Sequence, residues 1–269
     1  MSGRSEPVVP PTLRGWLGWT AALAALVVVV LGVRYAGDSE PGTVDARIGD
    51  ALYGVGPWRR NVALALDFLG EPGGSVLLVG ALVTGCLLFR RPRAAVLVVG
   101  GAGVAVVTAT LLKSVVGRTI HGEHLSYPSG HTAFATALAL VVALTVTGRS
   151  GLGRTAGLSL VLAAALVSGA AMGWAQVTLG AHYPTDVLGG WCTALAVVPV
   201  TAWLVDLTAD RMPDRLPGRA PGRAPGRMSG RGAGRPADPP SDRTADRTAG
   251  HSAGRPADRT ADAVRRENR

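Results

Sequence analysis

The stretch Lys113–His131, with the sequence KSVVGRTIHGEHLSYPSGH, joins two long apolar runs. The runs Ala94–Leu112 before it and 131–148 after it contain no Asp, Glu, Lys or Arg. The stretch itself holds the only lysine of the chain and three of its five histidines. Because about 20 apolar residues of helix cross the hydrocarbon core of a bilayer, this pattern predicts two membrane spans joined by a polar, titratable connection.

Comparable apolar runs recur along the chain and predict an all-α fold, a bundle of six transmembrane helices. The expected spans are residues 16–33, 72–89, 94–112, 131–148, 155–181 and 187–205. The run at 72–89 carries the weakest signal because four glycines interrupt it. Residues 34–71 are expected to form a longer loop with an interfacial helix around Trp58–Leu69.

Composition divides the chain into a leader at 1–15, a membrane domain at 16–206 and a tail at 207–269. The tail holds 14 arginines against 8 acidic residues and so carries most of the net charge of +9. Its Gly-, Pro- and Ala-rich repeats contain few large apolar residues, which predicts disorder. It has no aromatic residue to stack on bases, which argues against a nucleic-acid partner. Two interpretations stay open, a solvated tail and a tail that touches anionic inner-leaflet lipid.

The distribution of arginine predicts which end of the bundle faces the cytoplasm. Basic residues number two, three and two in the segments expected inside, 1–15, 90–93 and 148–154. They number four, two and none in the segments expected outside, 34–60, 113–130 and 177–182. With the arginine-rich tail, the bias favours a multi-pass cell-membrane protein with both termini inside and the histidine-rich stretch outside.

Three span ends with polar residues are predicted to lie on that outer face, and together they suit a phosphate group. Ser129 and Gly130 stand where a helix would start, and a helix N-terminus presents unpaired N–H groups to an anion. Lys113 ends the preceding span and adds a positive charge. Arg118 offers a planar fork that matches two phosphate oxygens.

The third span end contains His182 and Asp186, which are four residues apart. On a helix, this spacing would place both side chains on one face. A carboxylate that keeps one imidazole nitrogen protonated leaves the other nitrogen free for nucleophilic attack. His131 is then available as a general acid for the leaving group. The expected chemistry is phosphoryl transfer through a phosphohistidine.

The segments KSVVGR, YPSGH and LGAHYPTD resemble the three signature motifs of the type 2 phosphatidic acid phosphatase superfamily. This superfamily includes lipid phosphate phosphatases, undecaprenyl pyrophosphate phosphatases and vanadium haloperoxidases. The resemblance covers about residues 60–205 and implies a six-helix membrane bundle that needs neither a metal nor another cofactor. The site residues that it implies are His182 as nucleophile, Asp186 as its partner, His131 as acid, and Lys113, Ser129 and Gly130 around the phosphate.

The chain departs from the family pattern at two places where phosphate-binding arginines are expected. Ile120 and His121 replace an Arg-Pro pair of the first motif, and Ala175 and Gln176 replace a Ser-Arg pair that opens the third. Each lost charged hydrogen bond is worth about 1.5–3 kcal/mol. A different head group could instead be held by auxiliary residues, of which His121, His124 and Gln176 are the candidates. His121, Glu123 and His124 also suggest a metal site, but their spacing fits no zinc pattern, so no metal is expected.

The leading interpretation is an integral membrane phosphatase that hydrolyses a lipid phosphate or pyrophosphate, similar to phosphatidic acid or a polyprenyl pyrophosphate, at the outer face. The alternative is a weak or inactive family member that binds phosphorylated lipid or a partner protein, and the missing arginines favour it. A transporter is suggested only by the six spans, without a charged, broken helix at the bilayer centre. A haloperoxidase is disfavoured because the chain is short and membrane-bound.

The orientation can be tested with cysteines introduced at Glu123 and Ser150, which are expected on opposite sides of the membrane. An impermeant thiol reagent applied to intact cells should label the cysteine at 123 and leave the one at 150 unlabelled, because the basic loop around 150 is retained inside. Labelling after permeabilisation serves as the control. The reverse pattern in intact cells would invert the orientation.

Overall fold

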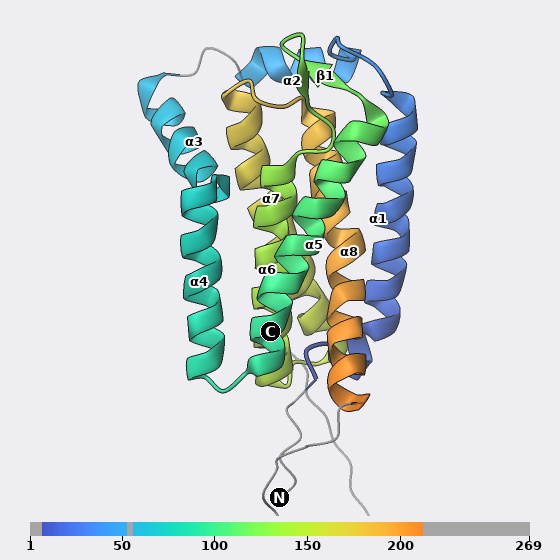
Figure 1. The fold of residues 1–269 in the computed structure, drawn as a ribbon, viewed down its shortest axis with the longest axis vertical. Helices are drawn as coiled ribbons and strands as arrows, with labels where there is room; N and C mark the ends of the chain where they lie inside the picture. The colour runs from blue at the N-terminus through green and yellow to red at the C-terminus, as the bar shows by residue number, and fades with distance from the viewer. Residues whose placement is uncertain (1–6, 53–55, 212–269) are drawn as a thin grey trace, which may run out of the picture. The chain divides into compact units, whose positions relative to one another are not determined.

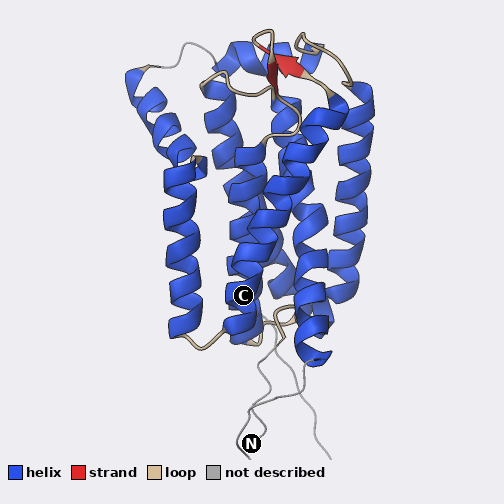
Figure 2. Ribbon diagram, viewed as in Figure 1, coloured by secondary structure: helices blue, strands red, loops and turns tan. Residues whose placement is uncertain are grey.

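The computed structural model describes residues 7–52 and 56–211, which are almost entirely helical (Figure 2). The helices are η1 (Pro11–Leu13), α1 (Arg14–Arg34), α2 (Thr43–Leu52), α3 (Pro57–Gly70), α4 (Pro72–Leu88), α5 (Pro92–Val116), α6 (Gly130–Ser150), α7 (Arg154–Thr178) and α8 (Pro184–Arg211). Two short antiparallel strands, β1 (Thr119–Ile120) and β2 (His124–Leu125), form a hairpin between α5 and α6.

Most of these helices are candidate membrane spans by length and composition, which confirms the predicted all-α bundle. Five helices are individually long and apolar enough to cross a membrane: η1 with α1, α5, α6, α7 and α8. The sixth candidate is the pair of α3 and α4, which bends by 65° at Glu71. Two features of the turn account for the bend. Pro72 has no N–H to donate to the preceding helix, and the backbone at Gly74 lies so close to the Phe68 carbonyl that a side chain there would overlap it.

The region 34–71 was predicted as a loop with one interfacial helix, and this is wrong in two respects. It contains a second helix, α2, which the sequence reasoning missed because its ten residues are short and mostly polar. The predicted helix at 58–69 exists as α3, but α3 continues into α4 as the upper part of a bent span (Figure 1). It therefore also packs against α6 and α7 of the bundle.

The helices alternate in direction, and this gathers the polar connections at one end of the bundle. Figure 1 shows α2 and the hairpin at the upper end, beside the end of α5 and the start of α6. The helix α6 packs against α5, α7 and α8, and α1 packs against α8. Alanines occupy many of the buried helix contacts, such as Ala105, Ala137 and Ala194, and small residues allow membrane helices to approach closely.

A buried carboxylate fastens the other end of the bundle. Asp206 of α8 accepts hydrogen bonds from the N–H groups of Val8 (2.8 Å) and Val9 (3.0 Å), and it lies 3.5 Å from Arg93. The leader expected at 1–15 is therefore packed from residue 7 onward, and α1 begins at Arg14. At the other boundary, α8 runs five residues into the expected tail, to Arg211. The disorder predicted for the rest of the tail lies outside the described residues.

Replacing Asp206 should therefore destabilise the bundle strongly. Asp206→Ala leaves two buried N–H groups without their acceptor and removes one of the carboxylates that face the mostly buried Arg93, so we expect the free energy of unfolding to fall by about 3 kcal/mol or more. Thermal unfolding in detergent measures the change. Asp210→Ala is the matched control, because Asp210 also pairs with Arg93 but is 59% exposed. Equal losses of stability in the two variants would contradict the anchoring role of Asp206.

Candidate active site

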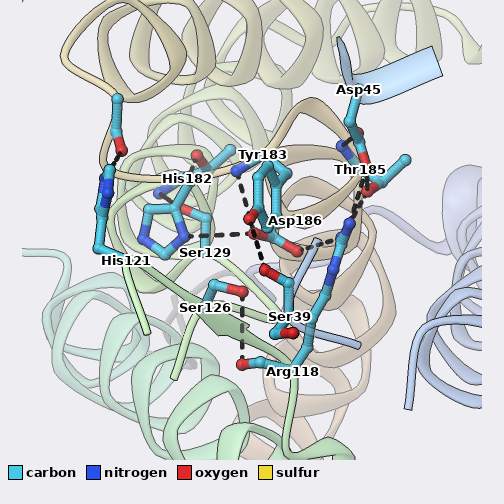
Figure 3. A network of polar contacts seen from close by, with 12 residues as sticks. Ser39, Asp45, Arg118, His121, Ser126, Ser129, His182, Tyr183, Thr185 and Asp186 are labelled. Atoms are coloured by element: carbon cyan, nitrogen blue, oxygen red, sulfur yellow. Dashed lines mark hydrogen bonds and ion pairs between the residues drawn. The ribbon is translucent and has the colours of Figure 1, made fainter. Parts of the chain in front are cut away.

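Three backbone segments from distant parts of the sequence meet at the upper end of the bundle. The N–H of Ser129, at the start of α6, donates to the Asp186 carbonyl at 2.9 Å. Nε2 of His121, from the hairpin, lies 2.8 Å from the carbonyl oxygen of Gly180, just before His182. The structure thus brings together the three polar segments that the sequence placed at separate span ends (Figure 3).

Two adjacent glycines of α8 allow this close approach. A side chain at Gly190 would overlap the carbonyl oxygen of Ser129, and one at Gly189 would overlap the ring of Tyr127. Tyr127 is fully buried and donates its hydroxyl to the Val28 carbonyl at 2.7 Å. Burial raises the pKa of the Tyr127 phenol well above its usual value, so the ring remains a neutral donor that ties this loop to α1.

His182 and Asp186 are neighbours, although not for the reason expected from their spacing. His182 lies in the connection before α8, which begins at Pro184, so the two residues do not share a helix face. Asp186 lies in the first turn of α8 and accepts a hydrogen bond from the Tyr183 N–H at 3.0 Å. This capping contact folds the connection back, so that Nδ1 of His182 lies 3.8 Å from Oδ2 of Asp186.

This arrangement leaves one nitrogen of His182 for chemistry. Nδ1 is enclosed and faces Asp186, beyond hydrogen-bond distance. Such contacts are often long in a site without substrate and shorten when the substrate binds. A carboxylate at Nδ1 favours the tautomer with the proton on that nitrogen, which exposes the lone pair of Nε2.

His131 lies in the first turn of α6 and faces the bend between α3 and α4. Its Nε2 is 3.5 Å from Oδ1 of Asp67 and 3.8 Å from Oε1 of Glu71. Gly70 packs directly against the imidazole, because a side chain there would overlap the ring. His131 follows Ser129 by two residues, and the Ser129 N–H bonds to the backbone of Asp186, whose carboxylate faces His182, so the start of α6 and the His182 segment lie side by side.

Arg118 occupies a different place from the one expected for a phosphate ligand. Its guanidinium is fully buried and stacks between two tyrosine rings, 4.2 Å from the Tyr35 centroid and 4.5 Å from that of Tyr183. One terminal nitrogen donates to Oδ1 of Asp186 at 2.6 Å, and the other donates to Oδ2 of Asp45 at 2.7 Å (Figure 3). Because protein carboxylates engage both terminal nitrogens, Arg118 positions Asp186 and is not presented to a phosphate.

The sequence reasoning missed Asp45, which completes this network from α2. Besides binding Arg118, its carboxylate accepts hydrogen bonds from the N–H of Thr185 (2.9 Å) and from the Thr185 hydroxyl (2.9 Å). An acidic group at the start of α8 also interacts favourably with the positive end of the helix dipole. Asp45 lies in the region expected to be a loop, and nothing in its local sequence distinguishes it from an exposed acid.

The other predicted phosphate residues begin α6. The Ser129 side chain is the helix cap, since it accepts from the Thr132 N–H at 3.4 Å and is fully buried. The hydroxyl therefore serves the helix, and the Ser129 N–H is taken by Asp186. Gly130 and His131 occupy the first turn, where backbone N–H groups have no partner within the helix. These N–H groups can receive an anion.

The auxiliary residues fall into two groups. Gln176 is buried and donates to Oδ1 of Asp67 at 2.7 Å, so it holds a neighbour of His131. His121 and His124 are exposed on the hairpin, and no metal-ligand group in the described part of the chain includes them or Glu123. The position that the family fills with arginine, Ile120, is buried in β1.

An apolar groove of about 780 Å³ extends from His131 along the bundle. Gly70, Pro72 and Gly130 line it near His131, and the side chains of α4, α5 and α6 continue its walls. Those walls are almost entirely apolar, with Val76, Val79, Val99, Val106 and Phe134 among them. His131 is therefore a polar residue at one end of an otherwise apolar groove between α4, α5 and α6.

Comparison with known proteins matches the PAP2 superfamily over residues 15–209. The chain belongs to the PAP2 superfamily. This membership confirms the resemblance and supports a membrane lipid phosphatase, a phosphoester hydrolase, at the level of the family. Among solved structures, the chain is similar to "the first transmembrane PAP2 type phosphatidylglycerolphosphate phosphatase from Bacillus subtilis". The two share 21% identity and a TM-score of 0.57, over 73% of this chain and 99% of that one, which shows the same fold. No curated protein matches the sequence.

The buried position of Arg118 predicts a large cost for its removal. Arg118→Gln leaves two buried carboxylates without their cation, and we expect the free energy of unfolding to fall by about 3–5 kcal/mol. Arg34→Gln is the control, since Arg34 also lies over the Tyr35 ring, at 5.2 Å, but is exposed. Thermal unfolding of both variants in detergent decides the matter, and an unchanged midpoint for Arg118→Gln would show that the network is not structural.

Proposed function

We propose that this PAP2 protein hydrolyses a phosphorylated membrane lipid through a phosphohistidine on His182. The observation that carries the proposal is that His131 lines one end of an apolar groove, while the adjoining Ser129 N–H bonds to the backbone of Asp186, the carboxylate that faces His182. A lipid phosphate suits such a site, because its anionic head group can lie among the polar residues and its hydrocarbon tail can lie in the apolar groove. Phosphatidic acid-like monoesters and polyprenyl pyrophosphate-like diphosphates both fit this description.

In the first step, Nε2 of His182 attacks phosphorus and the bond to the leaving oxygen breaks. Asp186 stabilises the positive charge that develops on the imidazole, because its carboxylate faces Nδ1. His131 gives a proton to the leaving oxygen, so that the lipid departs as a neutral alcohol or as a protonated phosphate. In the second step, His131 takes a proton from water, which attacks phosphorus and frees inorganic phosphate and His182.

Lys113 and the N–H groups at the start of α6 supply positive potential for the phosphate in this scheme. The chemistry needs no metal, since His182 supplies the nucleophile and His131 the proton. The arginine-rich loops at the opposite end of the bundle support an outer-face site with both termini inside. Membrane lipid then surrounds the apolar helix faces, and the substrate enters from the leaflet that contains the site.

The structure also favours a second candidate function, a weak or inactive family member that binds phosphorylated lipid or a partner protein. Arg118 is engaged by two carboxylates, and the positions of the missing arginines hold a buried Ile120 and a Gln176 bound to Asp67. The phosphate therefore meets fewer cationic donors than the family pattern provides. Binding without turnover would separate this candidate from the enzyme.

Phosphate release from a lipid panel tests the enzyme. Purified protein in detergent with chelator present should release phosphate from at least one of phosphatidic acid, phosphatidylglycerolphosphate and a polyprenyl pyrophosphate. His182→Ala should abolish both release and any acid-labile phosphoprotein, because the nucleophile is gone. His131→Ala should slow release by about 10²–10⁴-fold, most for the poorest leaving group.

His251→Ala in the tail is the matched histidine control and should keep the wild-type rate. No release from any lipid, together with measurable lipid binding, would favour the non-catalytic candidate. A wild-type rate in His182→Ala would exclude the proposed nucleophile.

A further inference from the structure

Asp67, Glu71 and His131 form a cluster of metal-ligating side chains at the bend between α3 and α4. One ligand atom from each lies within 4.8 Å of the other two, and Nε2 of His131 is 3.5 Å and 3.8 Å from the two carboxylates. Bonds of roughly 2.0–2.2 Å to a metal ion place neighbouring ligand atoms about 3–4 Å apart. The two measured separations from His131 fall in this range.

The nitrogen of His131 in this cluster lacks a hydrogen-bond partner. Nε2 is enclosed by protein, and neither carboxylate is within hydrogen-bond distance of it. Gln176 fixes one ligand, because it donates to Oδ1 of Asp67 at 2.7 Å, and Gly70 holds the imidazole in place from the side. The cluster thus brings together three possible ligand atoms, which come from α3, from the bend after it and from α6.

The charge of the cluster also calls for a cation. In residues 7–52 and 56–211, His131 is the sole basic side chain within ion-pair distance of Asp67 or Glu71. Arg118 is engaged with Asp45 and Asp186 and does not compensate these two carboxylates. With a neutral imidazole, the three side chains carry a charge of −2, which a divalent cation would neutralise.

We propose that Asp67, Glu71 and His131 bind a divalent transition-metal ion, and that this ion inhibits the phosphatase by occupying His131. The inhibitory part rests on the function proposed above, in which His131 donates the proton to the leaving oxygen. An imidazole that holds a metal on Nε2 is not an imidazolium and has lost that acidic proton. The ion also fixes the ring against the bend, because Nε2 faces Asp67 and Glu71 there.

The donor set indicates the class of metal. One imidazole nitrogen and two carboxylate oxygens suit Zn²⁺, Mn²⁺, Co²⁺ or Fe²⁺, whereas Mg²⁺ and Ca²⁺ prefer oxygen alone. Zinc is the most practical probe because it is not redox-active. We therefore expect the full-length protein, stripped with chelator, to bind one Zn²⁺ at this cluster and to bind Mg²⁺ far more weakly.

Calorimetric titration of the purified full-length protein with Zn²⁺ tests the site directly. Asp67→Asn and Glu71→Gln should each weaken zinc binding by at least about tenfold, since each removes a charged ligand. Glu123→Gln is the control, because Glu123 is an exposed carboxylate between two histidines and would contribute only to adventitious binding. An unchanged affinity in both cluster variants, or an equal loss in the control, would overturn the site.

Phosphate release measured over the same zinc range tests the inhibition. The wild type should lose activity with a midpoint near the calorimetric dissociation constant, and Glu71→Gln should need at least about ten times more zinc relative to its own metal-free rate. Activation by zinc, or the same midpoint in Glu71→Gln, would overturn the inhibitory role. The binding titration gives its result whether or not any lipid is hydrolysed, so the metal site and the phosphatase can fail separately.

Discussion

The guanidinium of Arg118, buried between Tyr35 and Tyr183, holds the site together. A buried cation needs partners for its charge, and here Asp45 and Asp186 accept from the two terminal nitrogens, while Nε has no hydrogen-bond partner among the described residues. These ion pairs and the Asp45–Thr185 hydrogen bonds also connect α2, the segment before the hairpin and the start of α8. Within this network, Asp186 faces His182.

This use of Arg118 changes which groups would meet a phosphate in the proposed reaction. From the sequence, an arginine five residues after Lys113 is predicted to be a second phosphate ligand. In the structure, its charge is instead paired with the carboxylates of Asp45 and Asp186. The remaining positive potential comes from Lys113 and the first turn of α6. On the opposite side, Asp67 and Glu71 bring negative charge to the acid. The proposed site therefore combines the cationic Lys113 with two carboxylates beside His131.

The bend between α3 and α4 links this electrostatic balance to the membrane. The same glycine- and proline-rich turn that breaks the span places Asp67, Glu71 and Gly70 against His131. The lower part of the span, α4, forms one wall of the apolar groove that begins at that histidine. If the span were a straight helix, Asp67 and Glu71 would not be turned toward His131 while α4 lines the groove. The polar residues and the apolar groove would then no longer meet at this histidine.

The sequence by itself determined the six-span architecture, because hydrocarbon thickness and the absence of charge within each run leave few alternatives. It also predicted that the polar segments share one end of the bundle, as the structure shows, and that His131, His182 and Asp186 form one site, which stays a prediction. It did not determine which charges face the substrate, since partners such as Asp45 and Asp67 lie far away in the chain and have no local signature. The tertiary structure decided that Arg118 is structural, that Asp186 reaches His182 through a capping turn, and that two acids flank His131. The physical reason is that composition and spacing fix how a chain crosses a membrane, whereas the pairing of buried charges depends on which helix ends meet.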